Sequence, residues 1–584
     1  MKSFPRIPHP ALAGFLALLA LAAAALPRGA RAGGGPYNTL LVVNAVSRDS
    51  RQLGAHYAKA HGLPEANVCM IHTDPHKPSV SVDDFEITIL RPILDHIARE
   101  GLAQQIHFLV LSMDIPTRVN YFNSVPAALF YGYKPKPPDA PTCFIVPDSV
   151  NQYYASERAY TSTAGWNRTN MPIVFALTAP DLKTGKAVVD RAVASVADPP
   201  PADAAFCLHG SGDAARNVRH RTYARAAMPF AWCGAAGAPD VRPTSTAVPS
   251  RPVALYMGGF AYIPTNFPGN IRFAPGAIAD HLTSCGGMLP EPCLKQSTVW
   301  DWFRLGATAS YGTVCEPCAY EAKFPDPMLA FWYWRGFTAG EALAMSVKNP
   351  YHGLFAGDPL AAPFARPPSV EILSPAPGHR TDGPVELSIS MEAHPDDGAP
   401  PVYLDLYIDG KFVRPVVRPL APTGNDLVVQ VGGETFSYTI APDEDLYRAA
   451  AGLAWAVNSR GLGRVKARAV SDRVELTVRD PLDPGSGAPL PVSVSAERGF
   501  AKDLYIGLRA GTPDLVVDET TGEGRACLFL HLGRAGSYAF AYPLDLSALP
   551  PGPHTIGLVV RDGTAVQAQS QTELPVEIVA KDLP

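Results

Sequence analysis

The chain has 584 residues, of which 47% are hydrophobic and 18% charged, and its formal net charge is −5 at pH 7. A chain of this length exceeds what a single hydrophobic core accommodates, so we expect several domains. The slight acidity and the absence of a basic cluster argue against nucleic acid as a partner.

Residues 1–32 have the pattern of a secretory signal peptide. Lys2 and Arg6 give a positive start, an uncharged apolar run follows, and Ala30-Arg31-Ala32 supplies the small residues that a signal peptidase needs. The apolar run is shorter than the ~20 residues that cross a bilayer, which favours removal over a retained anchor, with Gly33 as the new first residue. No later segment is long and apolar enough to span a membrane. We therefore expect an exported protein of the periplasm, the cell surface or the extracellular space.

Nine cysteines follow this segment. An exported chain meets an oxidising compartment, so some of these cysteines should pair. The candidates nearest in sequence are Cys285 with Cys293 and Cys315 with Cys318, although spacing does not determine connectivity. Cys315 and Cys318 also form a CxxC motif, but no second ligand pair stands at a zinc-binding spacing. Pairing or burial is the simpler expectation, and we expect neither a metal nor a cofactor.

Strand-like and helix-like segments alternate in the first 350 residues. The segment 83–101, for example, repeats apolar residues at helical spacing and ends at Gly101. Such alternation predicts an α/β fold with a doubly wound, mostly parallel sheet. A long polar and aromatic loop is expected over 115–170. The expected strands are 37–48, 67–72, 106–113, 173–178, 204–208, 253–257 and 307–313, and the expected helices are 49–61, 184–196 and 331–348.

Short alternating strands separated by proline and glycine turns replace this pattern after about residue 366. The run Gly552–Asp562 has period two and ends in a turn, and it resembles a strand typical of bacterial immunoglobulin-like domains. Residues 424–499 interrupt the region with a helix at about 443–459 among further strands. We therefore expect an α/β domain over 33–365, an all-β sandwich over 366–423 and 500–584, and an inserted α+β subdomain over 424–499.

Function in parallel sheets gathers where loops leave the carboxyl ends of the strands. If the sheet forms as expected, several polar or glycine positions share this edge. Each also has a purely structural explanation, such as turn initiation, strand capping or close backbone packing. The catalytic candidates are His209, Asp114, Asp213 and Cys315, with Ser211 as another nucleophile, and the ligand-binding candidates are Gly258, Gly259, Glu316 and Asp358.

Several ordered blocks resemble a little-characterised family of exported bacterial proteins. Examples are Gly62-Leu63-Pro64-Glu65-Ala66-Asn67, Phe273-Ala274-Pro275-Gly276-Ala277-Ile278 and Gly357-Asp358-Pro359-Leu360. The resemblance covers most of residues 37–364. It indicates related proteins, but it does not imply an activity, because none is assigned to that family.

The layout is more distantly similar to gingipain-type cysteine peptidases, which have a caspase-like sheet. In those enzymes one strand ends in His-Gly and the following strand ends in the nucleophilic cysteine. Phe206-Cys207-Leu208-His209-Gly210 fits the first element, whereas Val253-Ala254-Leu255-Tyr256-Met257-Gly258-Gly259 carries no cysteine. A dyad needs its thiol within hydrogen-bond reach of the imidazole, so the resemblance implies a scaffold without its expected nucleophile.

Three functions remain open. The first is a non-peptidase scaffold that binds a protein, peptide or glycan ligand on the strand-end edge. The second is a hydrolase in which His209 is the base, Asp114 or Asp213 orients it, and Cys315 or Ser211 attacks. The third is an adhesive or structural surface protein that acts through its immunoglobulin-like region.

Overall fold

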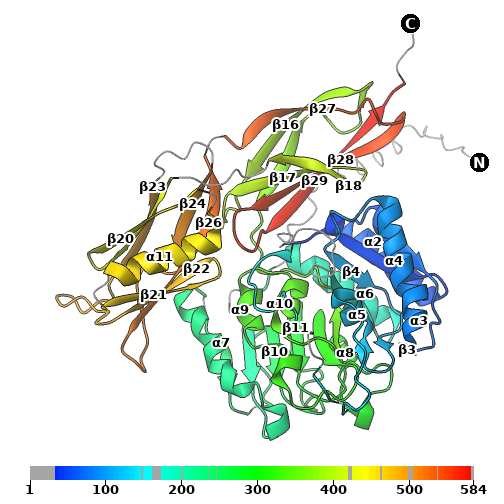
Figure 1. The fold of residues 1–584 in the computed structure, drawn as a ribbon, viewed down its shortest axis with the longest axis horizontal. Coiled ribbons are helices and arrows are strands. Elements are labelled where there is room, and N and C mark those ends of the chain that lie inside the picture. The colour runs from blue at the N-terminus through cyan, green and yellow to red at the C-terminus, as the bar shows by residue number, and fades with distance from the viewer. Residues whose placement is uncertain are drawn as a thin grey trace, which may run out of the picture.

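A large mixed sheet flanked by helices forms the first part of the molecule, and several antiparallel sheets form the second (Figure 1). The predicted signal peptide lies outside the residues that the structure describes. No helix in the described part of the chain is both long and apolar enough to cross a membrane. The computed structural model describes residues 33–580 except 142, 146–148, 161–171, 198, 202, 236, 245, 397, 418–423, 443, 461–462, 498–503 and 536.

The first strands and helices follow the predicted alternation. Gly62 and Gly101 end their helices with φ angles of 68° and 71°, a left-handed conformation that glycine adopts without a steric penalty. The predicted helix 83–101 contains a π-helical turn at Glu86–Leu90. The elements are β1 (Thr39–Asn44), α2 (Arg48–His61), β2 (Val68–Ile71), α3 (Val82–Phe85), α4 (Arg91–Glu100), β4 (Phe108–Leu111), α5 (Val125–Tyr131), β7 (Ile173–Ala176) and α6 (Leu182–Ala197), with a small sheet of β3 (Ser79–Val80), β5 (Arg118–Val119) and β6 (Asn123–Ser124).

The second half of the large sheet includes elements that were not predicted, among them β11 and the helices α7 and α8. The single helix expected over 331–348 is two helices, because Gly336 breaks the first at φ 102° and a capping box between Thr338 and Glu341 starts the second. The elements are β8 (Ala205–His209), α7 (His220–Trp232), β9 (Asp240–Arg242), β10 (Val253–Gly258), β11 (Phe273–His281), α8 (Val299–Leu305), β12 (Ala309–Thr313), α9 (Leu329–Trp334), α10 (Ala339–Ser346) and β13 (Gly353–Gly357).

The large sheet has the strand order β2-β1-β4-β7-β13-β12-β11-β10-β8-β9. Neighbouring strands from β12 to β9 run parallel, whereas β13 runs antiparallel to β12 and meets β7 at one bridge. Trp300, at the start of α8, donates a hydrogen bond to Thr178, just beyond β7, at 3.1 Å. The segment that follows β7 therefore lies beside the start of α8.

Both faces of this sheet are covered. On β8, Phe206 packs against Phe230 of α7, with ring centroids 5.2 Å apart. Its neighbour Cys207 points to the opposite face, where Tyr256 of β10 packs against Trp302 of α8. Alternation along each strand therefore divides the core into two layers, one under α7 and the other under α8.

Two sheets in the last third, antiparallel except for the parallel pairing of β15 with β29, share one core made of Leu387, Leu404, Leu558 and similar side chains. One sheet has the order β14-β16-β27 and the other β15-β29-β28-β17-β18. The strands are β14 (Ser369–Ser374), β15 (His379–Thr381), β16 (Pro384–Glu392), β17 (Pro401–Ile408), β18 (Lys411–Val417), β27 (Ala539–Asp545), β28 (Gly552–Asp562) and β29 (Gln569–Ile578).

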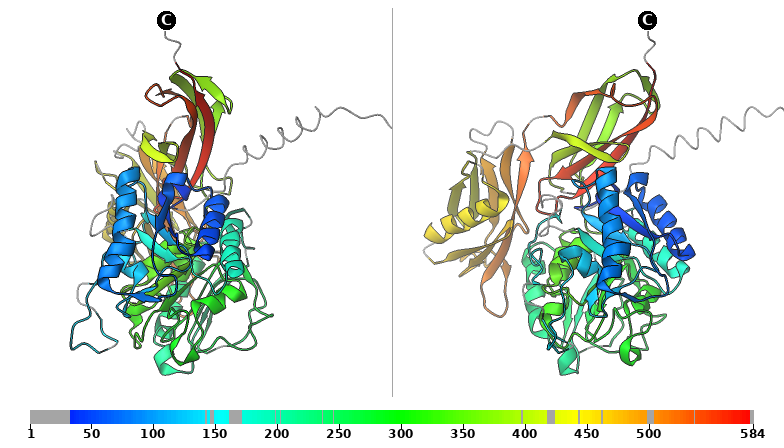
Figure 2. Two further views of the ribbon diagram at one scale, coloured as in Figure 1. Left: turned by 90° about the vertical axis from the view of Figure 1, so that its right-hand side faces the viewer. Right: turned by 45° about the vertical axis from the view of Figure 1, so that its right-hand side comes forward.

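Between β18 and β27 the chain forms a separate layer with its own core (Figure 2). β26 pairs with β22 of this layer, and β24 pairs with β26. The layer therefore extends to Arg534, beyond the predicted boundary at 499. The elements are β19 (Asp426–Val431), β20 (Glu434–Thr439), α11 (Leu446–Arg460), β21 (Val465–Val470), β22 (Arg473–Val478), β23 (Val492–Glu497), β24 (Leu504–Ala510), β25 (Val516–Val517) and β26 (Gly524–Arg534).

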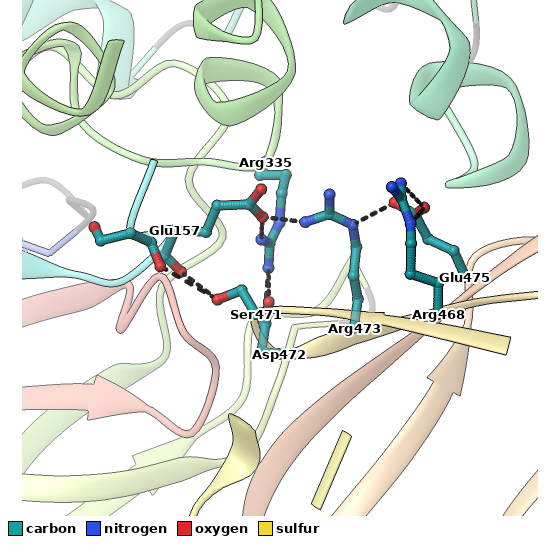
Figure 3. Close-up of polar contacts among 8 residues, drawn as sticks. Glu157, Arg335, Arg468, Ser471, Asp472, Arg473 and Glu475 are labelled. Carbon is teal, nitrogen blue, oxygen red and sulfur yellow. Dashed lines mark hydrogen bonds and ion pairs between the residues drawn. The ribbon is translucent and has the colours of Figure 1, made fainter. Parts of the chain in front are cut away.

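Buried charges join this layer to the α/β part (Figure 3). Arg335, beyond α9, contacts Glu157 at 3.0 Å and Asp472 at 2.7 Å. Arg473 of β22 also contacts Glu157, and it lies 3.2 Å from Glu475. The side chains of Glu157, Arg335, Asp472 and Arg473 are at most 6% exposed, so the contact is a desolvated ion network and not a surface pair.

Two disulfides are present among the described residues. The candidate pair Cys285 and Cys293 is bonded, but the candidate pair Cys315 and Cys318 is not, because Cys318 is joined to Cys143 in the long loop. Cys315 is a buried free thiol. Cys143 and Cys318 are 175 residues apart in the sequence, and the fold brings them together. Cysteine spacing in the sequence could not predict this pairing.

Candidate functional site at the carboxyl ends of β8, β9 and β10

His209 is the last residue of β8 and lies almost wholly inside the protein. Its side chain is 1% exposed, and its ring packs against Tyr256 with centroids 5.3 Å apart. Its Nε2 atom lies 3.3 Å from a carboxylate oxygen of Asp240, on the neighbouring strand β9. Burial lowers the pKa of His209, and the Asp240 carboxylate offsets only part of this effect.

Asp240 was not a predicted site residue, since β9 is short and lacks the apolar run of a buried strand. Arg242 donates from Nε to one oxygen of this carboxylate at 2.9 Å, and its Nη2 lies 2.9 Å from the other. Burial alone would raise the pKa of Asp240, but hydrogen bonds from Arg242 and His209 outweigh it and hold that pKa below its usual value. Asp240 is therefore an anion held between two partners.

Cys207 lies two residues before His209 on the same face of β8. Donor atoms of Cys207, His209 and Asp240 lie within 4.8 Å of one another, and these residue types can bind a metal ion. Arg242 already pairs with the Asp240 carboxylate, so an ion at this position would have to compete with that pair.

The end of β10, next to His209, offers no nucleophile. A side chain at Gly259 would approach the carbonyl oxygen of Arg216 to 2.2 Å, and one at Gly258 would approach the Phe260 ring to 2.6 Å. Both glycines are therefore required by close packing. Gly259 meets the loop after β8, which brings that loop and the end of β10 together at the edge of the sheet.

Behind this edge lies a buried ion pair that the sequence did not reveal. Arg219, the N-cap of α7, bonds Asp280 of β11 at 2.5 Å and donates to the carbonyl oxygen of Gly258 at 2.9 Å. Both side chains are at most 1% exposed. The only sequence signal was the block around 273–282, whose pattern gave no reason to expect a buried charge. This pair fixes the end of β10 relative to α7.

The loop after His209 is a local turn. Ser211 accepts a hydrogen bond from the backbone of Asp213 at 3.1 Å, and Asp213 caps the turn through the Ala215 amide at 2.9 Å. Asp213 also pairs with Arg216, which holds the pKa of its carboxyl below the usual value. The Asp213 carboxylate therefore contacts groups of its own turn and does not contact His209.

Cys315 and Glu316 follow β12, which is separated from β8 by β11 and β10. Burial raises the pKa of the Cys315 thiol to about 12. Glu316 accepts a hydrogen bond from the Cys318 amide at 2.8 Å. At about 4.8 Å per strand, β12 lies roughly 14 Å from β8 along the sheet, which is too far for direct contact with His209.

Asp114 and Asp358 lie farther away. Asp114 follows β4, six strand spacings from β8 or roughly 29 Å, and accepts a hydrogen bond from Ser47 at 2.5 Å. Asp358 does not share the edge of Glu316, because β13 runs antiparallel to β12 and ends beside its first residue. Its carboxylate contacts His61 Nε2 at 2.7 Å inside the core. The expectation of one shared edge fails for Asp358 for this topological reason.

Comparisons with known proteins add little to this geometry. No protein family matches the chain, and no curated protein is similar to it. A solved structure titled "Structure of Protease" aligns over 88% of this chain and 98% of its own, with 10% identity and a TM-score of 0.37. Fibronectin(III)-like modules of Clostridium thermocellum CbhA align over 37% of this chain and 97% of their own, with 12% identity and a TM-score of 0.07. Likenesses this weak support neither a fold assignment nor an activity.

Proposed function

We propose that the chain is an exported, non-peptidase protein that uses a caspase-like, gingipain-like sheet to bind a peptide or glycan at the carboxyl ends of β8, β9 and β10. In this proposal the last third contributes an immunoglobulin-like sandwich that accompanies the binding part. The observation that carries the proposal is the glycine pair at the end of β10, where such a peptidase would hold its nucleophile.

The nearest thiol is a poor substitute for that nucleophile. Attack requires an accessible thiolate, whereas Cys207 is completely buried and the pKa of its thiol is raised to about 12. His209 is 1% exposed, and its Nε2 atom already faces Asp240. A base in this position can reach neither solvent nor a bound substrate.

The accessible groups at this edge suit recognition better than catalysis. The side chain of Asp240 is 30% exposed and that of Arg242 is 46% exposed, so the pair offers both an acceptor and several donors to a ligand. Gly258 and Gly259 are themselves buried by close packing, so the groups that this edge presents to a ligand are those of Asp240 and Arg242. Amide-rich peptides and hydroxyl-rich glycans both match this mixture of donors and acceptors.

The hydrolase alternative has one observation in its favour, the proximity of Cys207, His209 and Asp240. It differs from the hydrolase expected from sequence, because Asp114, Asp213, Ser211 and Cys315 have no recorded contact with His209. The alternative requires the edge to open far enough to expose Cys207.

Binding and hydrolysis can be tested with the same full-length protein. We expect no cleavage of casein or of a fluorogenic peptide library, and binding of at least one probe on peptide or glycan arrays. Arg242→Ala should weaken that binding about tenfold, since a charged hydrogen bond contributes about 1.5 kcal/mol or more. Arg304→Ala is the matched control, because Arg304 is also an exposed arginine in an ion pair, on α8.

Cleavage that disappears in Cys207→Ala would replace the binding proposal with the hydrolase alternative. If Arg242→Ala left the binding unchanged, the ligand would have to bind at another part of the protein.

A further inference from the structure

The described chain begins inside the protein. Gly33, Gly34 and Gly35 are all buried, and each is packed so closely that a side chain would collide with a neighbour. A Cβ atom at Gly34 would lie 2.0 Å from the ring of Phe108, and one at Gly35 would lie 2.7 Å from the amide of Gln569. The three glycines therefore thread between β4 and β29 before β1 begins.

Gly33 touches a carboxylate. A Cβ atom on Gly33 would lie 2.2 Å from Oε1 of Glu341, which places the backbone of Gly33 directly against this side chain. Glu341 belongs to the first turn of α10 and is completely buried. The contact joins the start of the described chain to the middle of the core.

Glu341 has only neutral partners among the described residues. Thr338 donates to Oε2 from its amide and its hydroxyl, each at 3.1 Å, and Tyr160 donates its amide to Oε1 at 2.8 Å. Burial raises the pKa of this carboxyl to about 7. Tyr153, the other titratable group that Glu341 affects, has its own pKa raised by burial and is neutral. A buried carboxylate without a cation is costly, and none of the described residues supplies a counter-charge to Glu341.

We propose that cleavage of the Ala32–Gly33 peptide bond supplies that counter-charge, and that the free α-ammonium group of Gly33 forms a buried ion pair with Glu341 in the mature protein. The expected signal peptidase site lies at this bond. Water adds across the bond, Ala32 keeps the new carboxylate, and Gly33 gains the amine, which is protonated at neutral pH. Removal of the leader then completes the core as well as releasing the protein.

The contact also explains why the position is glycine. Any side chain at 33 would occupy the space of the Glu341 carboxylate, so only glycine lets the backbone of residue 33 lie against it. An extra residue before Gly33 would move the charge away and place a peptide bond beside Glu341.

The first test identifies the terminus. N-terminal sequencing and intact mass of the exported, full-length protein should show a chain that begins at Gly33. In the native protein, an amine-reactive reagent at pH 7 should modify the Gly33 amine at least tenfold more slowly than in the urea-denatured protein. A mature chain that begins elsewhere, or equal labelling rates, would overturn the proposal.

The second test separates an ion pair from simple packing by a double-mutant cycle. Protein that begins at Gly33 is compared with protein that carries one additional alanine before it, each with Glu341 and with Glu341→Gln. Glutamine retains the capping oxygen but removes the charge. We expect the extra alanine to lower the melting temperature by about 5–10 °C beside Glu341 and by less than half as much in the Glu341→Gln background. Equal losses in both backgrounds would show a steric effect only and would refute the ion pair.

Discussion

The ion network between the α/β part and the β19–β26 layer predicts a large effect for Glu157→Gln. Glu157 contacts both Arg335 and Arg473, and its side chain is 6% exposed. The substitution keeps the shape and hydrogen-bonding capacity of the side chain but removes its charge. The buried guanidinium groups of Arg335 and Arg473 then lose one of the carboxylates that neutralise them.

The size of the effect follows from what each arginine retains. Removing one partner of a buried ion pair costs about 3–5 kcal/mol, because the other charge remains desolvated. Here Arg335 keeps Asp472 at 2.7 Å and Arg473 keeps Glu475 at 3.2 Å, so we expect the lower end, about 3 kcal/mol. That figure corresponds to a roughly 150-fold rise in the population in which this layer is detached.

Hydrogen exchange of the hairpin formed by β21 and β22, together with urea denaturation, measures this change. Glu434→Gln is the control, since Glu434 pairs with Arg464 in the same layer but both side chains are about a third exposed or more. An exposed pair of this kind contributes less than about 1 kcal/mol. Equal, small effects of the two substitutions would refute the view that desolvation makes the Glu157 network important.

Three further predictions concern the thiols, the buried histidines and the edge opposite the candidate site. Peptide mapping without reductant should recover Cys143 joined to Cys318, with Cys315 alkylated only after denaturation; a peptide joining Cys315 to Cys318 would contradict the fold. Burial lowers the pKa of His281 to about 4, below its unfolded value of about 6.5, so the unfolded chain binds the extra proton and stability falls as pH drops through this window. The loss from His281 is about 2 kcal/mol between pH 7 and pH 5, and urea titrations should show a correspondingly smaller pH dependence in His281→Asn. Asp358→Ala should cost about 3 kcal/mol without changing ligand binding, whereas Asp190→Ala, in an exposed pair, should cost under about 1 kcal/mol; equal costs would show that burial of the His61 contact is unimportant.

Local patterns predicted the regular elements well where the signal was long and periodic. The strand at β1, the helix ending at Gly62 and the helix at α11 agree with expectation to within a few residues. A single helix was predicted over 331–348 because apolar periodicity continues across Gly336, and the capping pair Thr338 and Glu341 was not recognised as the start of a second helix. β11 was missed because proline and glycine interrupt its apolar run.

The candidate site was only partly predictable. His209, Gly258 and Gly259 were named as candidates because each stands at the end of an apolar strand, which is a local signal. Asp240 lies on a three-residue strand of mixed polarity, and its partnership with His209 depends on how β9 pairs with β8. Asp358 was expected at the same edge because the direction of β13 cannot be deduced from its residues.

The sequence by itself determined the long, periodic strands and helices, where the signal peptide should end, and that β10 lacks a nucleophilic cysteine, because these properties depend on residue type and local periodicity. Only the tertiary structure decided the partners: Cys143 for Cys318, Asp240 for His209, Asp280 for Arg219 and Gly33 for Glu341. Each pair joins segments distant in the sequence, and such contacts depend on strand order and direction, which many different sequence patterns allow. Burial then sets the energetic importance of each charge, because desolvation is a property of the assembled core.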